Sequence, residues 1–417
     1  MRAMLLCGAL SVACQGASDA RASKASDSTV VHAKASELRR AAAKRDSLAG
    51  FTVPAQCARG SLPVPRNSAR AGAVAGSDPV HIIAGWRDSA SSAGGAYATS
   101  PATTADTMPV ERPDSAVPAP APKTARALHA DSLARRKAKL RADSLAVIVQ
   151  QTDSAATRRL AGSLLPGCRV VAFYGNPLSK RMGILGELRP DSMLARLAKQ
   201  AAAYGAVDSA RPALPALELI ATVAQAGPGK SGQYRARMPD TLIARVMGWA
   251  EANHYLVILD IQTGRSTVAS EMVPLIKYLA RPYVHLALDP EFSIGPTKIP
   301  GKVIGRMDAA DVNVASSMLA ALVDSLKLPP KMLIVHRFTT PMLSNHQKIK
   351  LDPRVQIVID MDGFGPPKLK YGSYKAYVHD RPVQYAGFKL FYKNDKPMLT
   401  PAQVMEMDPV PLFIMYQ

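Results

Sequence analysis

The sequence predicts a (β/α)8 barrel, the TIM-type α/β fold, preceded by a long and mostly disordered N-terminal region. Three observations support this prediction. Aromatic residues are concentrated in the C-terminal part: of 13 Tyr, 8 Phe and 2 Trp, only Phe51, Trp86 and Tyr97 precede residue 166. From residue 169 onward, short apolar segments alternate with amphipathic ones. The number of these units, and the roughly 250 residues that contain them, are those of one barrel domain.

Residues 1–16, MRAMLLCGALSVACQG, have the pattern of a secretory signal, with one Arg, a short apolar core and then small residues. An apolar core of about a dozen residues is too short to span a bilayer. The segment also resembles a bacterial lipoprotein signal, in which the Cys after the cleavage point, here Cys14, is lipidated. We therefore expect an exported protein. It would be a lipoprotein anchored in the outer or cytoplasmic membrane, or a periplasmic or extracellular protein.

Residues 17–165 are rich in Ala, Ser, Pro, Arg and Asp and have little apolar bulk. Such a composition buries too little apolar surface to offset the entropy of ordering the chain. We therefore predict a low-complexity, disordered linker region here and a folded domain at 166–417. Within the linker, residues 130–151 have partly helical periodicity and an excess of Lys and Arg, which predicts a basic spacer helix.

The formal net charge of the chain is +20, from 52 Lys and Arg against 32 Asp and Glu. Half of this excess lies in residues 1–165 and half in the remainder, so the charge is spread along the chain. Because there is no basic patch interleaved with aromatic residues, nucleic acid is not an expected partner. A cationic N-terminal region on an exported protein instead suits an anionic envelope or membrane surface.

The cysteines leave one structural question open. If the signal is cleaved at Cys14, Cys57 and Cys168 remain as a possible disulfide pair, and the sequence alone does not establish the pairing. No CxxC or Cys/His cluster occurs in the sequence, so a structural zinc site is not expected.

Eight apolar segments have the near-continuous hydrophobic character of strands that are buried on both faces. They are RVVAFYG (169–175), LPALELIATVA (214–224), YLVILDIQ (255–262), YVHLALD (283–289), KVIGRMD (302–308), KMLIVHRFT (331–339), VQIVIDMD (355–362) and QYAGFKLFY (384–392).

Amphipathic segments between these strands predict helices, and several of them begin with Pro or Asp, which suit the first turn. Examples are 190–204, 239–252, 268–280 and 308–327. Strands and helices that alternate in this way predict a parallel sheet covered by helices, and eight units favour a closed barrel. An open doubly wound sheet is the alternative, but no Gly-rich turn follows the first strand.

Polar residues fall at the carboxyl ends of most predicted strands. In a barrel these ends surround one mouth, where active sites form. Crowded carboxylates in a half-buried site repel one another and lose hydration, which is costly unless they are used or neutralised. The candidate catalytic residues are Asp260, Asp289, Glu291, Asp360 and Asp362. The candidate substrate-binding residues are Tyr174, Asn176, Gln262, Arg265, Asp308, His336, Phe364 and Lys389; Asp308 has a second interpretation as a helix cap.

Residues 169–417 resemble the barrel of a group of exported bacterial proteins, often lipoproteins, with glycoside-hydrolase-like architecture. In the large glycosidase clan with this fold, the acid/base ends strand four and the nucleophile ends strand seven. The resemblance implies these roles for Asp289 or Glu291 and for Asp360 or Asp362, with Asp260 as a rival because the clan uses Glu in both places. The resemblance rests on FYGNPLSKRMGILGEL (173–188), LDIQTGRS (259–266), LALDPEF (286–292), MDAADVN (307–313), IDMDGFG (359–365) and PVPLFIMYQ (409–417).

Three functions are compatible with these residues. The first is an exported carbohydrate-active hydrolase that acts on a polysaccharide or glycan without a cofactor, through a protonated and an ionised carboxyl group. The second is a metal-dependent hydrolase, for example of phosphoesters, whose carboxylates and His336 hold Mg²⁺ or Ca²⁺. The third is a non-catalytic binding barrel at the cell envelope. Two carboxyls facing each other across a cleft favour the first, and a cluster converging on one point favours the second.

Overall fold

The structure is a computed structural model that describes Cys57 and residues 159–417. The predicted signal at 1–16, the candidate lipidation site Cys14 and the predicted helix at 130–151 lie outside the described residues. The predicted linker 17–165 also lies outside them, apart from Cys57 and residues 159–165.

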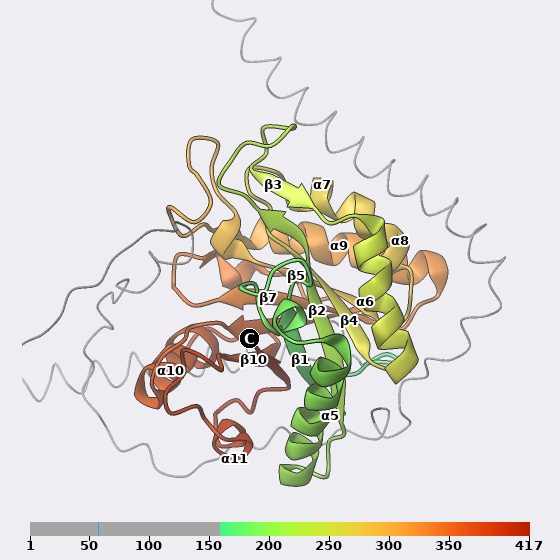
Figure 1. The fold of residues 1–417 in the computed structure, drawn as a ribbon, viewed down its shortest axis with the longest axis vertical. Coiled ribbons are helices and arrows are strands. Elements are labelled where there is room, and N and C mark those ends of the chain that lie inside the picture. The colour runs from blue at the N-terminus through green and yellow to red at the C-terminus, as the bar shows by residue number, and fades with distance from the viewer. Residues whose placement is uncertain (1–56, 58–158) are drawn as a thin grey trace, which may run out of the picture. The chain divides into compact units, whose positions relative to one another are not determined.

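Eight parallel strands close into a barrel with helices on its outside, as predicted (Figure 1). Around the barrel the strands follow the order β1, β11, β10, β9, β7, β5, β4 and β2, and β1 closes the ring by pairing with both β11 and β2. The strands are β1 (Arg169–Gly175), β2 (Ala213–Ala224), β4 (Leu256–Ile261), β5 (Val284–Leu288), β7 (Lys331–Arg337), β9 (Val355–Met361), β10 (Tyr385–Leu390) and β11 (Phe413–Tyr416).

Helices and short strands occupy the connections between the barrel strands. The helices are α4 (Ile184–Glu187), α5 (Pro190–Val207), α6 (Asp240–Asn253), α7 (Val268–Met272), α8 (Ile276–Leu279), α9 (Ala309–Leu326), α10 (Pro367–Tyr374) and α11 (Pro401–Met405). Shorter helical turns are η2 (Val273–Leu275), η3 (Pro290–Phe292), η4 (His346–Lys348) and η5 (Lys375–His379), and the additional strands are β3 (Arg235–Arg237), β6 (Met307–Asp308) and β8 (Leu343–Ser344).

The prediction of a strand at 302–308 is wrong. Most of this segment is an exposed loop, and only Met307 and Asp308 form a strand, β6, which pairs with β8 outside the barrel. The eighth barrel strand is instead β11, four residues near the end of the described chain. Asp360 therefore lies on the sixth barrel strand in chain order, Asp362 directly follows that strand, and Lys389 lies on the seventh. The correspondence with strand seven of the glycosidase clan is not present.

Local sequence explains how the helices begin. Pro190 occupies the first turn of α5, and Asp308 caps α9 in a reciprocal arrangement with Asp311. By length and composition α9 could cross a membrane, with a mean hydropathy of 1.2. It packs on β7, however, and its buried face includes Val312 and Leu319, so it serves as a core helix of the barrel.

A disulfide joins Cys57 to Cys168, the residue before β1, with their Cα atoms 5.0 Å apart. Both cysteines are fully buried. The bond attaches a point 111 residues upstream to the barrel. It confirms the pairing that the sequence left open.

Candidate active site

Polar side chains from opposite sides of the barrel meet inside it, toward the carboxyl ends of the strands. In parallel strands, residues in register project to the same side of the sheet. His336 of β7 is in register with Asp360 of β9, which is in register with Gly387 of β10. We call the carboxyl groups gathered here the carboxylate cluster; it comprises Glu218, Asp260, Asp289, Glu291, Asp360 and Asp362.

His336 lies at the centre of the carboxylate cluster. Its Nε2 is 3.0 Å from Glu218 Oε1 on β2, and its Nδ1 is 3.1 Å from Asp362 Oδ1 just after β9. Its Nδ1 also lies 3.4 Å from Asp360 Oδ2, and its Nε2 lies 3.9 Å from Asp260 Oδ1. The ring is 1% exposed. One imidazole thus faces carboxylates on both of its nitrogens.

Lys389 supplies a second cation at the mouth side of the cluster. Its Nζ donates to Asp362 Oδ2 at 3.1 Å and lies 3.9 Å from the centre of the Tyr174 ring. The hydroxyl of Tyr174 in turn donates to Asp260 Oδ2 at 3.2 Å. Lys389 and His336 therefore contact different oxygens of Asp362, and Lys389 also contacts Tyr174 on β1.

Gln262 and Asp289 form the part of the site contributed by β4 and β5. The Gln262 amide donates to Asp289 Oδ2 at 3.2 Å, and Asp289 Oδ1 accepts from the backbone amide of Glu291 at 3.2 Å. Asp289 thereby caps η3 and fixes the backbone of Glu291. No hydrogen bond to the Glu291 carboxyl group occurs among the described residues.

Asp362 is held in its ionised form. Burial would raise its pKa, but the charges of His336 and Lys389 outweigh burial and bring the pKa below the usual value of an aspartate. Burial likewise opposes the charge on His336, but Asp362, Asp360 and Glu218 raise its pKa well above that of a free imidazole. The raised pKa favours the imidazolium form of the ring, which can donate through both nitrogens.

Three other acids of the cluster, Glu291, Asp260 and Asp360, have raised pKa values, which favour their protonated form. Burial, reinforced by Asp289, raises the pKa of Glu291 well above its usual value. Burial raises the pKa of Asp260 in the same way, and burial with the nearby charge of Asp362 does so for Asp360. One carboxyl group with a lowered pKa thus lies in the same mouth as three whose pKa values are raised.

Gly387 makes room for Asp360. A Cβ atom at Gly387 would lie 2.6 Å from Asp360 Oδ1 and 3.0 Å from Asp360 Cα, closer than van der Waals contact allows. Both oxygens of Asp360 are buried without a hydrogen-bond partner among the described residues, as are Glu218 Oε2 and Asp260 Oδ1. A neutral acid is far less costly than a carboxylate in such a position.

Within the cluster, exposure is greatest at the rim. The side chain of Asp362 is 11% exposed, whereas those of Asp260, Asp360 and Glu218 are 0% exposed. Asp289 and Lys389 are each only slightly exposed, and Glu291 is half-buried. Asp362 and Glu291 are thus the acids of the cluster that a ligand at the mouth reaches first.

Three predicted substrate-binding residues, Asn176, Arg265 and Asp308, make contacts with the surrounding loops and strands. The Asn176 amide donates to Ile220 O, and its oxygen caps the backbone of Leu178. Arg265 donates twice to Lys298 O, at 2.9 and 2.7 Å, and stacks on Tyr234. Asp308 caps α9 and accepts from Ser344 and Asn345, away from the cluster.

The remaining predicted residues lie at or near the site. Phe364 is 38% exposed on the loop after β9 and packs edge-on against Phe391. Glu218 was missed because it lies within β2, whereas polar residues were sought at strand ends. A lone Glu in an otherwise apolar predicted strand was the signal that could have identified it.

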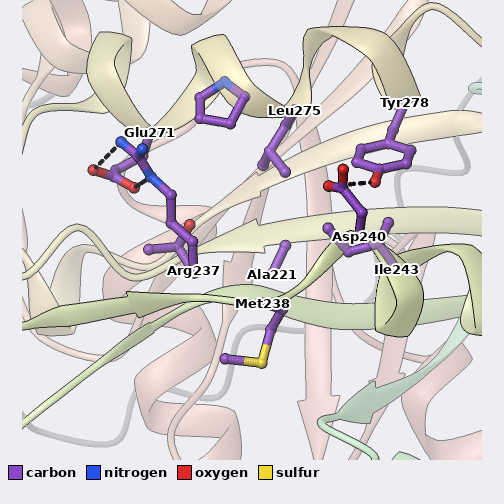
Figure 2. A pocket seen from close by; sticks show the side chains of 10 residues that line it. Ala221, Arg237, Met238, Asp240, Ile243, Glu271, Leu275 and Tyr278 are labelled. Atoms are coloured by element: carbon purple, nitrogen blue, oxygen red, sulfur yellow. Dashed lines mark hydrogen bonds and ion pairs between the residues drawn. The ribbon is translucent and has the colours of Figure 1, made fainter.

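A small cavity lies elsewhere, between the outside of the barrel and the helices (Figure 2). Its volume of about 20 Å³ suits a single water molecule and no sugar. Arg237 and Glu271 form an ion pair at its edge, with Nε and Oε2 2.7 Å apart. The cavity is lined by Ala221, Thr222, Arg237, Met238, Asp240, Ile243, Glu271, Pro274, Leu275 and Tyr278.

Comparisons with known proteins identify no family for this chain. No protein-family profile matches the chain, and no curated protein matches it. Among solved structures, the chain is similar to the Clostridial cellulose synthase subunit Z from Clostridioides difficile, with a TM-score of 0.32 and 7% sequence identity. The match covers 60% of this chain and 91% of that chain. At this level of similarity no family is identified, and the chemistry of the site rests on its own geometry.

Proposed function

We propose that the barrel is an exported glycoside hydrolase in which Glu291 is the general acid and Asp362 is the ionised carboxylate. The observation that carries the proposal is the opposite shift of their pKa values within one mouth: lowered for Asp362 and raised for Glu291. Two carboxyl groups whose environments separate their pKa values in this way are the pair that glycoside hydrolysis requires. The substrate would be a polysaccharide or glycan.

Each group has a defined part in the proposed reaction. Protonated Glu291 donates its proton to the oxygen of the leaving sugar as the glycosidic bond breaks. Asp362 attacks the anomeric carbon or takes a proton from the water that does so. His336 and Lys389 are positioning residues that keep Asp362 ionised, and exposed Phe364 offers a ring on which a sugar can stack.

Export is part of the proposal. The disulfide between Cys57 and Cys168 supports it, because disulfides persist in oxidising compartments and are rare in the cytosol. The signal-like residues 1–16 support it independently. A lipid anchor at Cys14 would place the barrel at the cell envelope.

The test is a panel of glycans incubated with the full chain and with the variants Glu291→Gln and Asp362→Asn. Loss of a general acid or of its partner carboxylate lowers the rate about 10²–10⁴-fold. Asp408→Asn is the matched control, because Asp408 is 48% exposed and pairs with His379 outside the cluster. Glycan turnover that survives both site substitutions contradicts the assigned roles.

A metal-dependent hydrolase is the second candidate. Ligand atoms of Glu218, Asp260 and His336 lie within 4.8 Å of one another, as do those of His336, Asp360 and Asp362. Both groups include His336, whose imidazolium form has no lone pair for a metal. A cation would have to displace that proton, so its binding would weaken as the pH falls. Turnover abolished by a chelator and restored by Mg²⁺ or Ca²⁺ would favour this candidate.

A further inference from the structure

A loop at the barrel mouth projects from a rigid base. We call residues 294–304, between η3 and β6, the rim loop. Its base is closed by two backbone hydrogen bonds, from Gly305 N to Glu291 O at 2.6 Å and from Arg306 N to Ser293 O at 2.8 Å. Ile294 N also donates to Gly264 O at 3.0 Å. The ends of the segment therefore lie together, as in an Ω-loop.

Two further features fix the rim loop in place. A Cβ atom at Gly305 would collide with the backbone oxygens of Ser293, Glu291 and Pro290, so only glycine permits this closure. The guanidinium of Arg265 donates twice to Lys298 O and stacks on Tyr234 from the loop after β2. The rim loop is thus held by contacts at its base and along its length.

The outer part of the rim loop is apolar and cationic. Ile299 is 37% exposed, and Val303 and Ile304 are each 40% exposed, so three aliphatic side chains within six residues of one loop face solvent. Lys298, Lys302 and Arg306 are exposed beside them. No acidic residue occurs between 292 and 307, nor in the adjoining loop 225–234, which adds exposed Lys230.

These residue types fit a lipid surface better than a protein. Protein interfaces are enriched in aromatic residues and depleted of Lys, and the rim loop has Lys298 and Lys302 and no aromatic residue. Aliphatic side chains flanked by lysines are instead typical of segments that insert into the boundary of an anionic membrane. Each Lys or Arg near such a surface adds electrostatic attraction that falls off within a Debye length.

We propose that the rim loop docks on the surface of an anionic phospholipid membrane, with Ile299, Val303 and Ile304 inserted and the lysines against the headgroups. This docking would orient the barrel mouth toward the membrane surface. It is independent of the proposed function, because it concerns the loop and not the acids.

The experiment uses the full chain with a fluorescent reporter in the loop. Ile304→Trp is mixed with vesicles of phosphatidylcholine and phosphatidylglycerol, and the spectrum of the parent chain, which contains Trp86 and Trp249, is subtracted. Val207→Trp is the matched control, since Val207 is 45% exposed at the end of α5, before β2 begins, and so far from the mouth. We expect a blue-shifted emission and quenching by brominated lipid for Ile304→Trp alone.

A second variant tests the energetics of insertion. The triple substitution Ile299→Ser, Val303→Ser and Ile304→Ser should weaken vesicle binding at least about tenfold, and Val207→Ser should not. Because residues 1–165 are present in every variant, their own membrane affinity cancels. Unchanged emission of Ile304→Trp on vesicles that bind the chain would overturn the proposal. So would an equal shift with pure phosphatidylcholine vesicles or with a soluble polyanion alone.

Discussion

His336 and Asp362 form the central ion pair of the barrel, with Nδ1 and Oδ1 3.1 Å apart. The other nitrogen of the ring contacts Glu218, so His336 joins β9 to β2, which lies opposite in the strand order. This pair lowers the pKa of Asp362 beside Asp260, Glu291 and Asp360, whose pKa values are raised.

Replacing His336 should destabilise the barrel in a pH-dependent way. His336→Gln removes a buried cation and leaves carboxylates unpaired, which costs about 3–5 kcal/mol. The loss should be larger at acid pH, because the contribution of protonated His336 is complete below about 6.5 and is lost as the pH rises toward its raised folded pKa. Urea unfolding of the parent and the variant at about pH 5 and about pH 8 measures the difference. An equal loss at both would contradict the ion pair.

The raised and lowered pKa values in the cluster determine how the free energy of unfolding changes with pH. The pKa of His336 is raised in the folded state, so its contribution is complete below the unfolded value near 6.5 and is lost as the pH rises through the folded value. Asp260 and Asp360 change stability in the same direction, because their pKa values are also raised. Asp362 acts oppositely: its contribution is present above about 3.8 and is lost on acidification.

Asp360→Asn isolates one of these contributions. The amide stays neutral at every pH, whereas folding of the parent increasingly disfavours the ionised form of Asp360 as the pH rises above about 3.8. The variant should therefore gain stability relative to the parent between acid and neutral pH. Thermal unfolding across this range measures the change. If the stability of the parent instead rises relative to that of the variant as the pH increases, Asp360 is ionised in the folded state.

Gly387→Ala should lower stability by about 1–3 kcal/mol, because the added methyl group overlaps Asp360 Oδ1 and lies 3.0 Å from Val358 Cγ1. Gly248→Ala is the matched control. Gly248 lies within α6, where an added Cβ meets nothing within 4 Å, so the substitution should stabilise by about 0.5–1 kcal/mol. Chemical denaturation compares them, and equal effects would show that the packing of Asp360 against β10 is unimportant.

Reduction of the disulfide between Cys57 and Cys168 should lower the free energy of unfolding by about 2–4 kcal/mol. Cys168→Ser should show the same loss and no further response to a reductant. Cys14→Ser should respond to the reductant as the parent does. Equal unfolding midpoints with and without reductant would mean that the bond adds no stability.

The sequence predicted the fold where strands are long and apolar, and failed where local signals are ambiguous. RVVAFYG and VQIVIDMD could be recognised because continuous burial requires continuous apolar residues. KVIGRMD has a similar composition, but Val303 and Ile304 are exposed on a loop between two glycines. The true last strand, Phe413–Tyr416, is only four residues long and follows prolines, so no periodicity marked it.

Part of the candidate site was predictable, because polar residues at strand ends mark the mouth of a barrel. Asp260, Asp289, Asp360 and Asp362 follow the strand-end rule, and the structure brings them together around His336. Asp308 obeys the same rule in sequence, yet it caps a helix, because an Asp before a helix is identical in sequence to an Asp at a barrel mouth. Arg265 binds a backbone carbonyl that only the folded loop supplies.

Infrared difference spectroscopy tests the opposite protonation of Glu291 and Asp362 most directly, and it needs no substrate. At neutral pH, the difference between the parent and Glu291→Gln should contain the carbonyl stretch of a protonated acid. The difference between the parent and Asp362→Asn should contain carboxylate bands only. A carboxylate signal from Glu291, or a protonated acid at Asp362, would contradict the proposed pair of roles.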